Sequence, residues 1–308
     1  MRLFCAFCAA ILLTTPASAE PAQFPVSKFG SVDMTLTESL GGATAAALKR
    51  GNLFYRIGRL RPDDPIRIAS DAIVRLDMIK AVDGKEGMST CTASIISEQL
   101  VLTNYHCIPG FRGTVKAAGI MLDYFTQGDR GAKLVRTETA PILSDADLDF
   151  AVVRLTERLP RPVRPLPLQE VMVRPGERLV MIHHPAGQPK MMTSHDCRVH
   201  GRNEDPAVRH VFHVCDTLPG SSGGIILSGS TLQPAALHYA GGLLAADPDS
   251  FNRATSAAAF FAQLRTLTGT PNPPVRRPGP ATAQAQPVET TPRPARSSVD
   301  SINDFINN

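Results

Sequence analysis

The chain has 308 residues, of which 43% are hydrophobic and 19% charged, so it can bury a hydrophobic core and is not a disordered polymer. A net charge of +4, no Trp and an aromatic content of 6% argue against nucleic-acid binding, because the chain has no dense block of Lys and Arg and few rings for base stacking. The length allows one large domain or two small ones.

The first 19 residues have the features of a secretory signal peptide. Arg2 supplies positive charge, residues 3–13 form an apolar stretch, and residues 17–19 (Ala-Ser-Ala) form a small-residue cleavage site. A short membrane anchor is the alternative. We expect a mature chain that begins near Glu20, is secreted or periplasmic, and has no stable membrane insertion after signal removal.

Four cysteines remain after that cleavage: Cys91, Cys107, Cys197 and Cys215. An oxidising compartment permits disulfides, and the absence of CxxC spacing argues against a zinc site. Three pairings are open, and spacing alone does not choose among them. Two local bridges, Cys91–Cys107 and Cys197–Cys215, would each close a short loop and contribute roughly 3 kcal/mol.

From Ile57 onward, short apolar runs rich in β-branched residues alternate with turn residues. These runs have the length of strands, and they cover residues 72–76, 92–96, 100–103, 150–155, 178–182, 211–214, 224–227 and 235–238. The proline-rich stretch 159–168 cannot be helical and suits an extended crossing between two halves. The pattern predicts an all-β sandwich or pair of barrels.

The end of the chain departs from this pattern. Residues 256–266 place apolar side chains at helical spacing and predict one late helix. Prolines crowd the sequence after Gly269, which predicts a disordered tail over 268–308 that could dock a partner.

Three local patterns carry the chemistry. They are a histidine after a strand (Leu102-Thr103-Asn104-Tyr105-His106-Cys107), an acid leading into a strand (Asp147-Leu148-Asp149-Phe150), and a serine in a glycine-rich turn (Pro219-Gly220-Ser221-Ser222-Gly223). In this order they resemble the trypsin/chymotrypsin-like serine peptidases over residues 57–267. The Pro219–Gly223 turn, and His238 followed by Gly241 and Gly242, make the chain similar to the bacterial V8-like, or glutamyl, endopeptidases.

The resemblance implies two packed six-stranded β-barrels of the chymotrypsin type, a crossing near 159–168 and a C-terminal helix. It implies a secreted serine endopeptidase that acts on protein or peptide substrates, with no cofactor and no metal. His106, Asp149 and Ser222 would form the triad, because a serine hydroxyl needs an adjacent base and an acid that orients it. The amides of Gly220 and Ser222 would form the oxyanion hole.

Two of these assignments have neighbouring alternatives. Ser222 is preferred to Ser221 because Gly223 follows it directly and Gly220 lies two residues before it. Asp149 is preferred to Asp147 because it directly precedes the Phe-Ala-Val-Val strand. Asp147 is interpreted as a solvated loop acid.

Substrate preference also follows from the resemblance. Thr217 and His238 occupy positions at which glutamyl endopeptidases read a substrate carboxylate, and both side chains can bond one. Asp216 lies where trypsin-like enzymes place an acid for Lys or Arg, which gives the competing reading of a basic P1 residue, and His238 could instead be a packed strand histidine. A non-catalytic binding protein on the same fold is the alternative function.

The resemblance also bears on activation. Arg56-Ile57-Gly58 resembles a processing junction, so residues 20–56 are a candidate propeptide. Ser221 stands where animal trypsins have the Asp that receives the new N-terminal amine. Maturation should therefore not depend on that ion pair.

Overall fold

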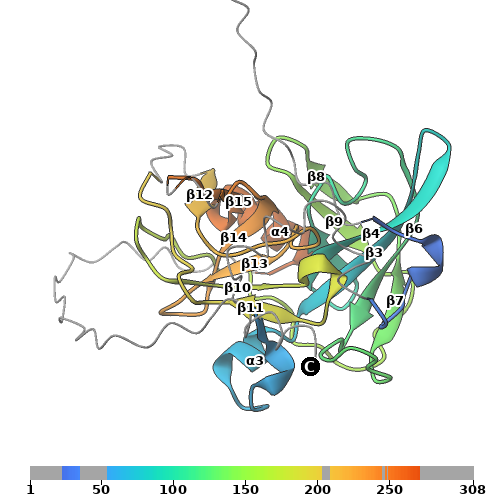
Figure 1. Ribbon diagram of the computed structural model, residues 1–308, viewed down its shortest axis with the longest axis horizontal. Helices are drawn as coiled ribbons and strands as arrows, with labels where there is room; N and C mark the ends of the chain where they lie inside the picture. Colours follow the sequence, from blue (N-terminus) through green and yellow to red (C-terminus); the bar gives the residue numbers. More distant parts are fainter. Residues whose placement is uncertain (1–22, 35–53, 203–208, 245–246, 248, 271–308) are drawn as a thin grey trace, which may run out of the picture.

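The structure is a computed structural model that describes residues 23–34, 54–202, 209–244, 247 and 249–270 (Figure 1). The expected signal peptide over 1–19 lies outside the described residues, as does the expected tail beyond residue 270. Within the described part of the chain, no helix combines the length and the apolar character needed to cross a bilayer.

The first barrel is an eight-stranded sheet. Its strands are β1 (Gln23–Phe24), β3 (Ile73–Val82), β4 (Lys85–Ile95), β5 (Leu100–Thr103), β6 (Thr114–Leu122), β7 (Lys133–Thr137), β8 (Leu143–Asp145) and β9 (Phe150–Arg154). All pairs are antiparallel in the order β7-β6-β3-β4-β5-β9-β8, with β1 added to β4. A bridge between Thr137 and Leu155 brings β7 back to the end of β9 and closes the barrel.

The second barrel is a seven-stranded sheet. Its strands are β2 (Tyr55–Arg56), β10 (Leu179–His183), β11 (Met191–Thr193), β12 (His210–His213), β13 (Ile225–Ser228), β14 (Pro234–Ala240) and β15 (Asn252–Ser256). They are arranged in the order β12-β15-β14-β13-β10-β11-β2. Isolated bridges from Arg198 to Arg178 and from Val199 to His213 link the start of β10 to the edge strand β12.

The predicted all-β architecture with a C-terminal helix is confirmed, although the two sheets have eight and seven strands rather than six each. The additional pairings include two-residue strands, β1 and β2, that sequence periodicity cannot detect. The predicted helix is α4 (Ala257–Thr268), which ends where Gly269 takes a left-handed φ of 67°.

Short helical segments complete the fold. They are η1 (Val26–Lys28), η3 (Ile57–Arg59), α3 (Pro65–Ala69) and η4 (Pro185–Gly187). Asp64 caps α3 by accepting hydrogen bonds from the amides of Ile66 and Arg67. Of these segments, η4 matters most for the site, because it lies against the glycine-rich turn described below.

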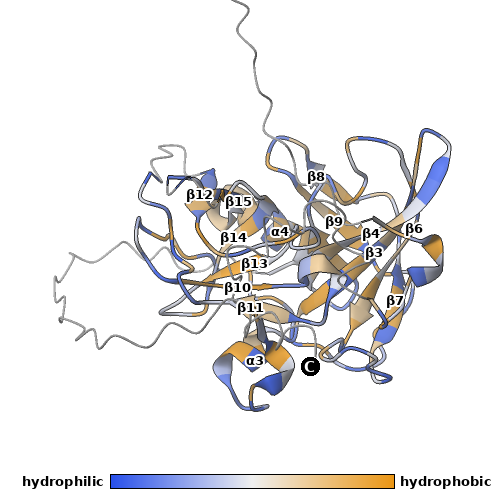
Figure 2. Ribbon diagram, viewed as in Figure 1, coloured by the Kyte–Doolittle hydropathy of each residue, from blue (hydrophilic) through white to orange (hydrophobic). Residues whose placement is uncertain are grey.

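The two barrels share one hydrophobic core. Its largest cluster includes Leu76 and Val152 from the first barrel, Ile225 and Leu237 from the second, and Phe260 of α4. Strands β10 and β13 are strongly hydrophobic, whereas the peripheral loops are hydrophilic (Figure 2). Removing this surface from water holds the halves together, at roughly 25 cal/mol per Å² of apolar area buried.

The predicted crossing connects the barrels as an extended segment. The amide of Leu166 donates to the carbonyl of Ile95 in the first barrel, and the amide of Val171 donates to the carbonyl of Pro234 in the second. The chain between these two bonds therefore passes from one half to the other.

The described parts of the candidate propeptide pack on the barrels. Residues 23–34 add β1 to β4, and Phe24 and Met34 are buried against Met88. Residues 55–56 form β2 on β11. Removal of residues 20–56 during maturation stays a prediction.

Candidate active site

His106 lies in a tight turn at the end of a buried strand. β5 ends at Thr103, and the carbonyl of Asn104 then accepts hydrogen bonds from the amides of Cys107 and Ile108. Because Cys107 is covalently joined to Cys91 of β4, with an S–S distance of 2.00 Å, the turn is tied to the barrel on the carboxyl side of the histidine. The end of β5, the turn at Asn104 and the disulfide together therefore restrict the position of the His106 imidazole.

Asp149 binds His106 with both carboxylate oxygens. Oδ2 lies 2.7 Å from Nδ1 of the ring, and Oδ1 accepts the backbone amide of His106 at 2.9 Å. A carboxylate only accepts, so Nδ1 carries the hydrogen in this pair and Nε2 of the neutral ring is left as the acceptor. Nε2 is buried and has no hydrogen-bond partner among the described residues.

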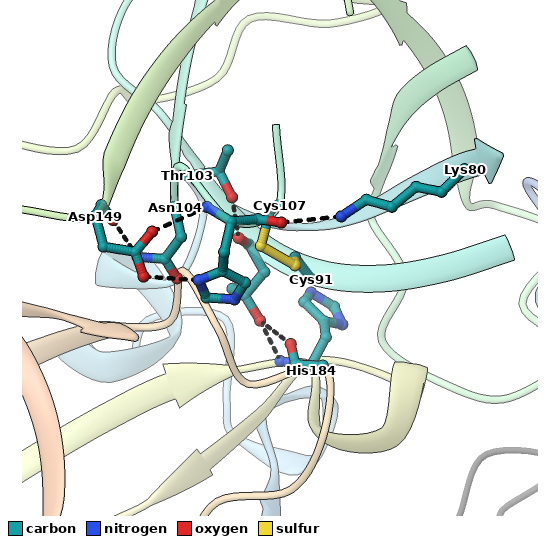
Figure 3. Close-up of a disulfide and its surroundings, with 10 residues drawn as sticks. Lys80, Cys91, Thr103, Asn104, Cys107, Asp149 and His184 are labelled. Atoms are coloured by element: carbon teal, nitrogen blue, oxygen red, sulfur yellow. Dashed lines mark hydrogen bonds and ion pairs between the residues drawn. A yellow bond between two sulfur atoms is a disulfide. The ribbon is translucent and has the colours of Figure 1, made fainter. Parts of the chain in front are cut away.

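The backbone of Asp149 is also held in place. Its φ is 50°, a left-handed conformation that Asp tolerates better than most residues, and its carbonyl accepts a 2.7 Å hydrogen bond from Nδ2 of Asn104. In Figure 3, Asp149 and Asn104 lie on one side of the Cys91–Cys107 disulfide and Lys80 lies on the other. Asp147, the alternative acid, is exposed and lies in the turn before β9.

Lys80 supports the histidine turn from β3. Its Nζ donates to the carbonyl of His106 at 2.9 Å, and burial lowers the pKa of Lys80 to about 8, an effect that Asp149 partly offsets. His106, Cys91 and Cys107 present ligand atoms within 4.8 Å of one another. However, both sulfurs are joined in the disulfide, and a metal would require thiolates.

Ser222 lies where the two barrels meet. Its carbonyl accepts the amide of Thr92 in β4 at 2.7 Å, and Thr103 Oγ1 donates to the Thr92 carbonyl at 3.0 Å. A side chain at Gly223, which has a φ of 82°, would overlap the Thr92 carbonyl oxygen. The glycine therefore permits its own backbone to approach the backbone of Thr92, beside the side chain of Thr103, which lies three residues before His106.

The two adjacent serines have different surroundings. Ser221 is fully buried, and its Oγ lies 2.9 Å from Nδ1 of His183 while it accepts the amide of Leu218 at 3.0 Å. Ser222 is 6% exposed, and the structure records no side-chain hydrogen bond for it or for Nε2 of His106. The hydroxyl of Ser221 is thus committed to the interior, which favours Ser222 as the reactive serine.

The turn leaves two amides open. The amides of Ser221, Gly223 and Gly224 donate to the carbonyls of Leu218, His238 and Ser221. The amides of Gly220 and Ser222 have no acceptor among the described residues. Open donors two residues apart are what an oxyanion hole requires.

The expected substrate-binding residues lie beside this turn. Nδ2 of Asn252 donates to the Cys215 carbonyl at 2.7 Å and to Thr217 Oγ1 at 3.2 Å, while Oδ1 of Asn252 accepts the amide of Gly242 at 2.8 Å. Cys215 is joined to Cys197, with an S–S distance of 2.06 Å. Asn252 therefore holds together the two chain segments that contain Thr217 and the glycines after His238.

His238 is a buried histidine with a second histidine behind it. Its Nδ1 lies 3.1 Å from Nε2 of His213, and it is 2% exposed. Burial lowers the pKa of His238 well below the ordinary value, and the neighbouring His213 and His106 lower it further. Thr193 Oγ1 donates to the Asp216 carbonyl, which fixes the backbone at that position.

Several residues at the site carry no recognisable sequence signal. The turn of residues 219–223, called the serine turn below, is contacted by Thr92, His183 and Ala186. These hydrogen bonds join segments about 30 to 130 residues apart in the sequence. Asn252 has a local signal, because it begins an Asn-x-Ala sequence, Asn252-Arg253-Ala254, directly before the last helix. The others are set by tertiary contacts alone.

Comparison with known proteins gives a family match for part of the chain. Residues 91–234 match the sequence profile of the trypsin-like peptidase domain. Over that region the chain is similar to trypsin-like peptidases. This match includes His106, Asp149 and Ser222, and it begins at the first cysteine of the Cys91–Cys107 bridge.

Solved structures share the fold of this chain. A Glu endopeptidase in complex with MPD has a TM-score of 0.52 at 18% identity, covering 70% of this chain and 96% of that one. The HtrA-type protease AlgW with a decapeptide has a TM-score of 0.51 at 16% identity, covering 68% of each chain. At these identities the likeness concerns the two-barrel fold.

One curated relative is the secreted RxLR effector protein 73 of Plasmopara viticola. It is 31% identical over 191 residues, which is 56% of this chain. The chain spans 46% of the length of that relative.

Proposed function

We propose that the protein is a serine endopeptidase with His106 as general base, Asp149 as its orienting acid and Ser222 as nucleophile. The observation that carries the proposal is the 2.7 Å bond between His106 and Asp149, which leaves Nε2 as an unpartnered acceptor. Further support comes from Ser222 at the barrel seam, and from the open amides of Gly220 and Ser222.

In the acylation step, Ser222 Oγ attacks the carbonyl carbon of the scissile peptide bond while its proton passes to Nε2 of His106. The carbonyl oxygen becomes an anion, which the amides of Gly220 and Ser222 stabilise. Asp149 stabilises the resulting imidazolium. The C–N bond then breaks, the proton moves from His106 to the leaving amine, and an ester on Ser222 remains.

Deacylation repeats the sequence with water. Nε2 of His106 takes a proton from the water as its oxygen attacks the ester carbonyl, and the same amides hold the second oxyanion. Collapse breaks the ester C–O bond and returns the proton to Ser222 Oγ. The reaction needs no group beyond the chain and water.

Within this proposal, Thr217 and His238 give a preference for an acidic P1 residue. When Nε2 of His213 donates to Nδ1 of His238, Nε2 of His238 carries a hydrogen that can bond a carboxylate. Thr217 adds a hydroxyl donor, positioned by Asn252. A similar fold is that of a Glu endopeptidase, whose name agrees with this preference and supports the proposal of a V8-like specificity.

We further propose that the enzyme acts outside the cytoplasm, as a secreted or periplasmic protein. Two disulfides support an oxidising compartment, and the curated relative is named as a secreted protein. Its substrates would be proteins or peptides, as expected of a peptidase domain.

A fluorophosphonate probe, which reacts with an activated serine, tests the proposal together with casein cleavage. Ser222→Ala should abolish labelling and lower kcat by up to ~10⁶-fold. Ser221→Ala is the matched control, and it should retain labelling. A wild-type chain that is folded, unlabelled and inactive would instead favour a non-catalytic binding protein on this fold.

A further inference from the structure

The direction of the Gly220 amide is set by its own peptide plane. The carbonyl of Pro219 accepts the amide of Ala186 in η4 at 2.6 Å. In a trans peptide the carbonyl and the following N–H point in opposite directions, so this bond turns the Gly220 N–H away from η4. On the other side, the Gly220 carbonyl accepts Thr92 Oγ1 at 2.9 Å.

The segment that supplies the Ala186 amide is itself in an unfavourable conformation. Ala186 has φ 53° and ψ 28°, a left-handed conformation that is unfavourable for an L-residue with a Cβ. It persists only where its surroundings hold it. The carbonyl of the next residue, Gly187, accepts Nη1 of Arg75 at 3.0 Å, and Nε2 of Gln188 donates to the Met34 carbonyl at 2.7 Å.

Arg75 joins this segment to the N-terminal segment, residues 23–34. Its Nε and Nη2 bond the two oxygens of Asp77 at 2.7 and 2.8 Å, and Nη2 also donates to the Ser31 carbonyl at 2.6 Å. Asp77 in turn accepts the amide of Gly30 at 3.0 Å. Both charged side chains are fully buried, so this pair is tolerated because hydrogen bonds compensate for the lost hydration.

Packing contacts also join the N-terminal segment to η4, and η4 to the serine turn. A Cβ on Gly187 would lie 3.1 Å from Met34 Cε and 3.2 Å from Phe24 Cζ, so the N-terminal segment lies directly against η4. A Cβ on Gly220 would lie 2.8 Å from the His184 carbonyl and 3.1 Å from the Gly187 amide. The serine turn, η4 and the N-terminal segment are therefore three layers in direct contact.

We propose that Arg75 is a positioning residue for the oxyanion hole, and that the N-terminal segment remains part of the active enzyme as its support. Without Arg75, η4 loses a bond that holds Ala186 left-handed, and the Pro219–Gly220 peptide can then rotate its N–H out of the hole. The inference rests on the proposed function. It changes one expectation: a cut after Arg56 would leave residues 23–34 bound.

The test uses Arg75→Met in the full chain, with kcat, KM and the inhibition constant of a peptidyl boronic acid as readouts. A boronic acid forms a tetrahedral adduct whose oxygen occupies the oxyanion hole. We expect kcat to fall about 10²-fold and boronic acid binding to weaken by a similar factor, with KM changed less than about threefold. Arg265→Met is the matched control, because it removes another largely buried arginine–carboxylate pair, with Glu170, and kcat should be unaffected.

Arg75→Met leaves Asp77 buried without its partner and could fail to fold, so a second variant decides in that case. Gln188→Leu removes only the bond to Met34, and it should lower kcat and boronic acid binding together, by about threefold to tenfold. If the folded variants keep wild-type kcat, or lose activity through KM alone, the proposal is wrong. A wild-type chain that is not labelled by fluorophosphonate would instead overturn the proposed function.

Mass spectrometry of the purified active enzyme tests the retained segment. Residues 23–34 should be present, either in the intact chain or as a bound fragment released on denaturation. An active enzyme that binds the boronic acid at full affinity without them would overturn this part of the proposal.

Discussion

The histidines of the two barrels have contrasting surroundings. In the first barrel, His106 is held by the Asp149 carboxylate through both its ring and its backbone amide. In the second barrel, His183, His213 and His238 are buried and bonded to hydroxyls or to each other. Burial lowers the pKa of His183 and that of His213 to about 3.

The contrast shows what makes an imidazole useful as a base. Burial alone removes the charged form, so His183, His213 and His238 serve as neutral hydrogen-bonding groups at physiological pH. A carboxylate partner fixes the tautomer and compensates the charge that develops when Nε2 takes a proton. By this criterion His106 is suited to proton transfer, and His238 is suited to recognition.

The largest effect should come from removing the charge beside His106. Asp149→Asn keeps the side-chain volume but offers an amide that can stabilise the wrong tautomer, so kcat should fall by about 10⁴-fold. Asp147→Asn, in the exposed turn, should leave kcat unchanged. Steady-state kinetics on one peptide substrate measures both, and an equal loss in both variants would contradict the assignment of Asp149.

The two disulfides offer a second comparison between the barrels. Replacing either pair by alanines, Cys91 with Cys107 or Cys197 with Cys215, should lower the free energy of unfolding by about 3 kcal/mol, because the cysteines are 16 and 18 residues apart. Urea unfolding measures this loss. Loss of the Cys91–Cys107 bridge should also lower kcat, because this bridge holds the turn that contains His106. Loss of the Cys197–Cys215 bridge should instead change KM, because Thr217 lies two residues after Cys215. A change in KM from loss of the first bridge, with a fall in kcat from loss of the second, would contradict these assignments.

The recognition role of His238 predicts a smaller, selective effect. His238→Ala removes one hydrogen bond to a charged P1 group, so kcat/KM for an acidic P1 residue should fall about 10- to 100-fold relative to a neutral one. Profiling with a peptide library measures the ratio. An unaltered P1 profile would remove His238 from the pocket, and a preference for Lys or Arg would point to Asp216 instead.

The buried histidines predict a modest loss of stability in acid. The unfolded chain protonates a histidine near pH 6.5, whereas His183 and His213 stay neutral in the fold until about pH 3. The unfolded state therefore binds more protons in this window, and stability present above pH 6.5 is lost as the pH falls toward 3. The slope should reach up to about 1.4 kcal/mol per pH unit for each histidine.

Denaturant unfolding between pH 4 and 6 measures this slope. His213→Asn should reduce it by the share of one titrating group. An unchanged slope in the His213 variant would contradict the buried, neutral assignment.

Some of the site could be predicted from the sequence. A histidine before a cysteine, an acid before a strand and a glycine-rich serine turn are local signals, and the structure pairs His106 with Asp149 as expected. Arg75 could not be found in this way, because an arginine in a strand is ordinarily interpreted as facing solvent. Arg75 and Asp77 share one face of β3, and that face is covered by an N-terminal segment whose pairing no local pattern reveals.

The contact between the two barrels at Ser222 and Thr92 determines what happens when the chain is cut between the barrels. The backbone contact that places Ser222 against Thr92 is also a contact that joins the halves, so neither half alone would contain all three residues of the proposed triad. Two polypeptides separated within residues 159–168 should be inert when apart and regain turnover when brought together. Fused to a pair of interacting partners, they would act as a reporter of proximity.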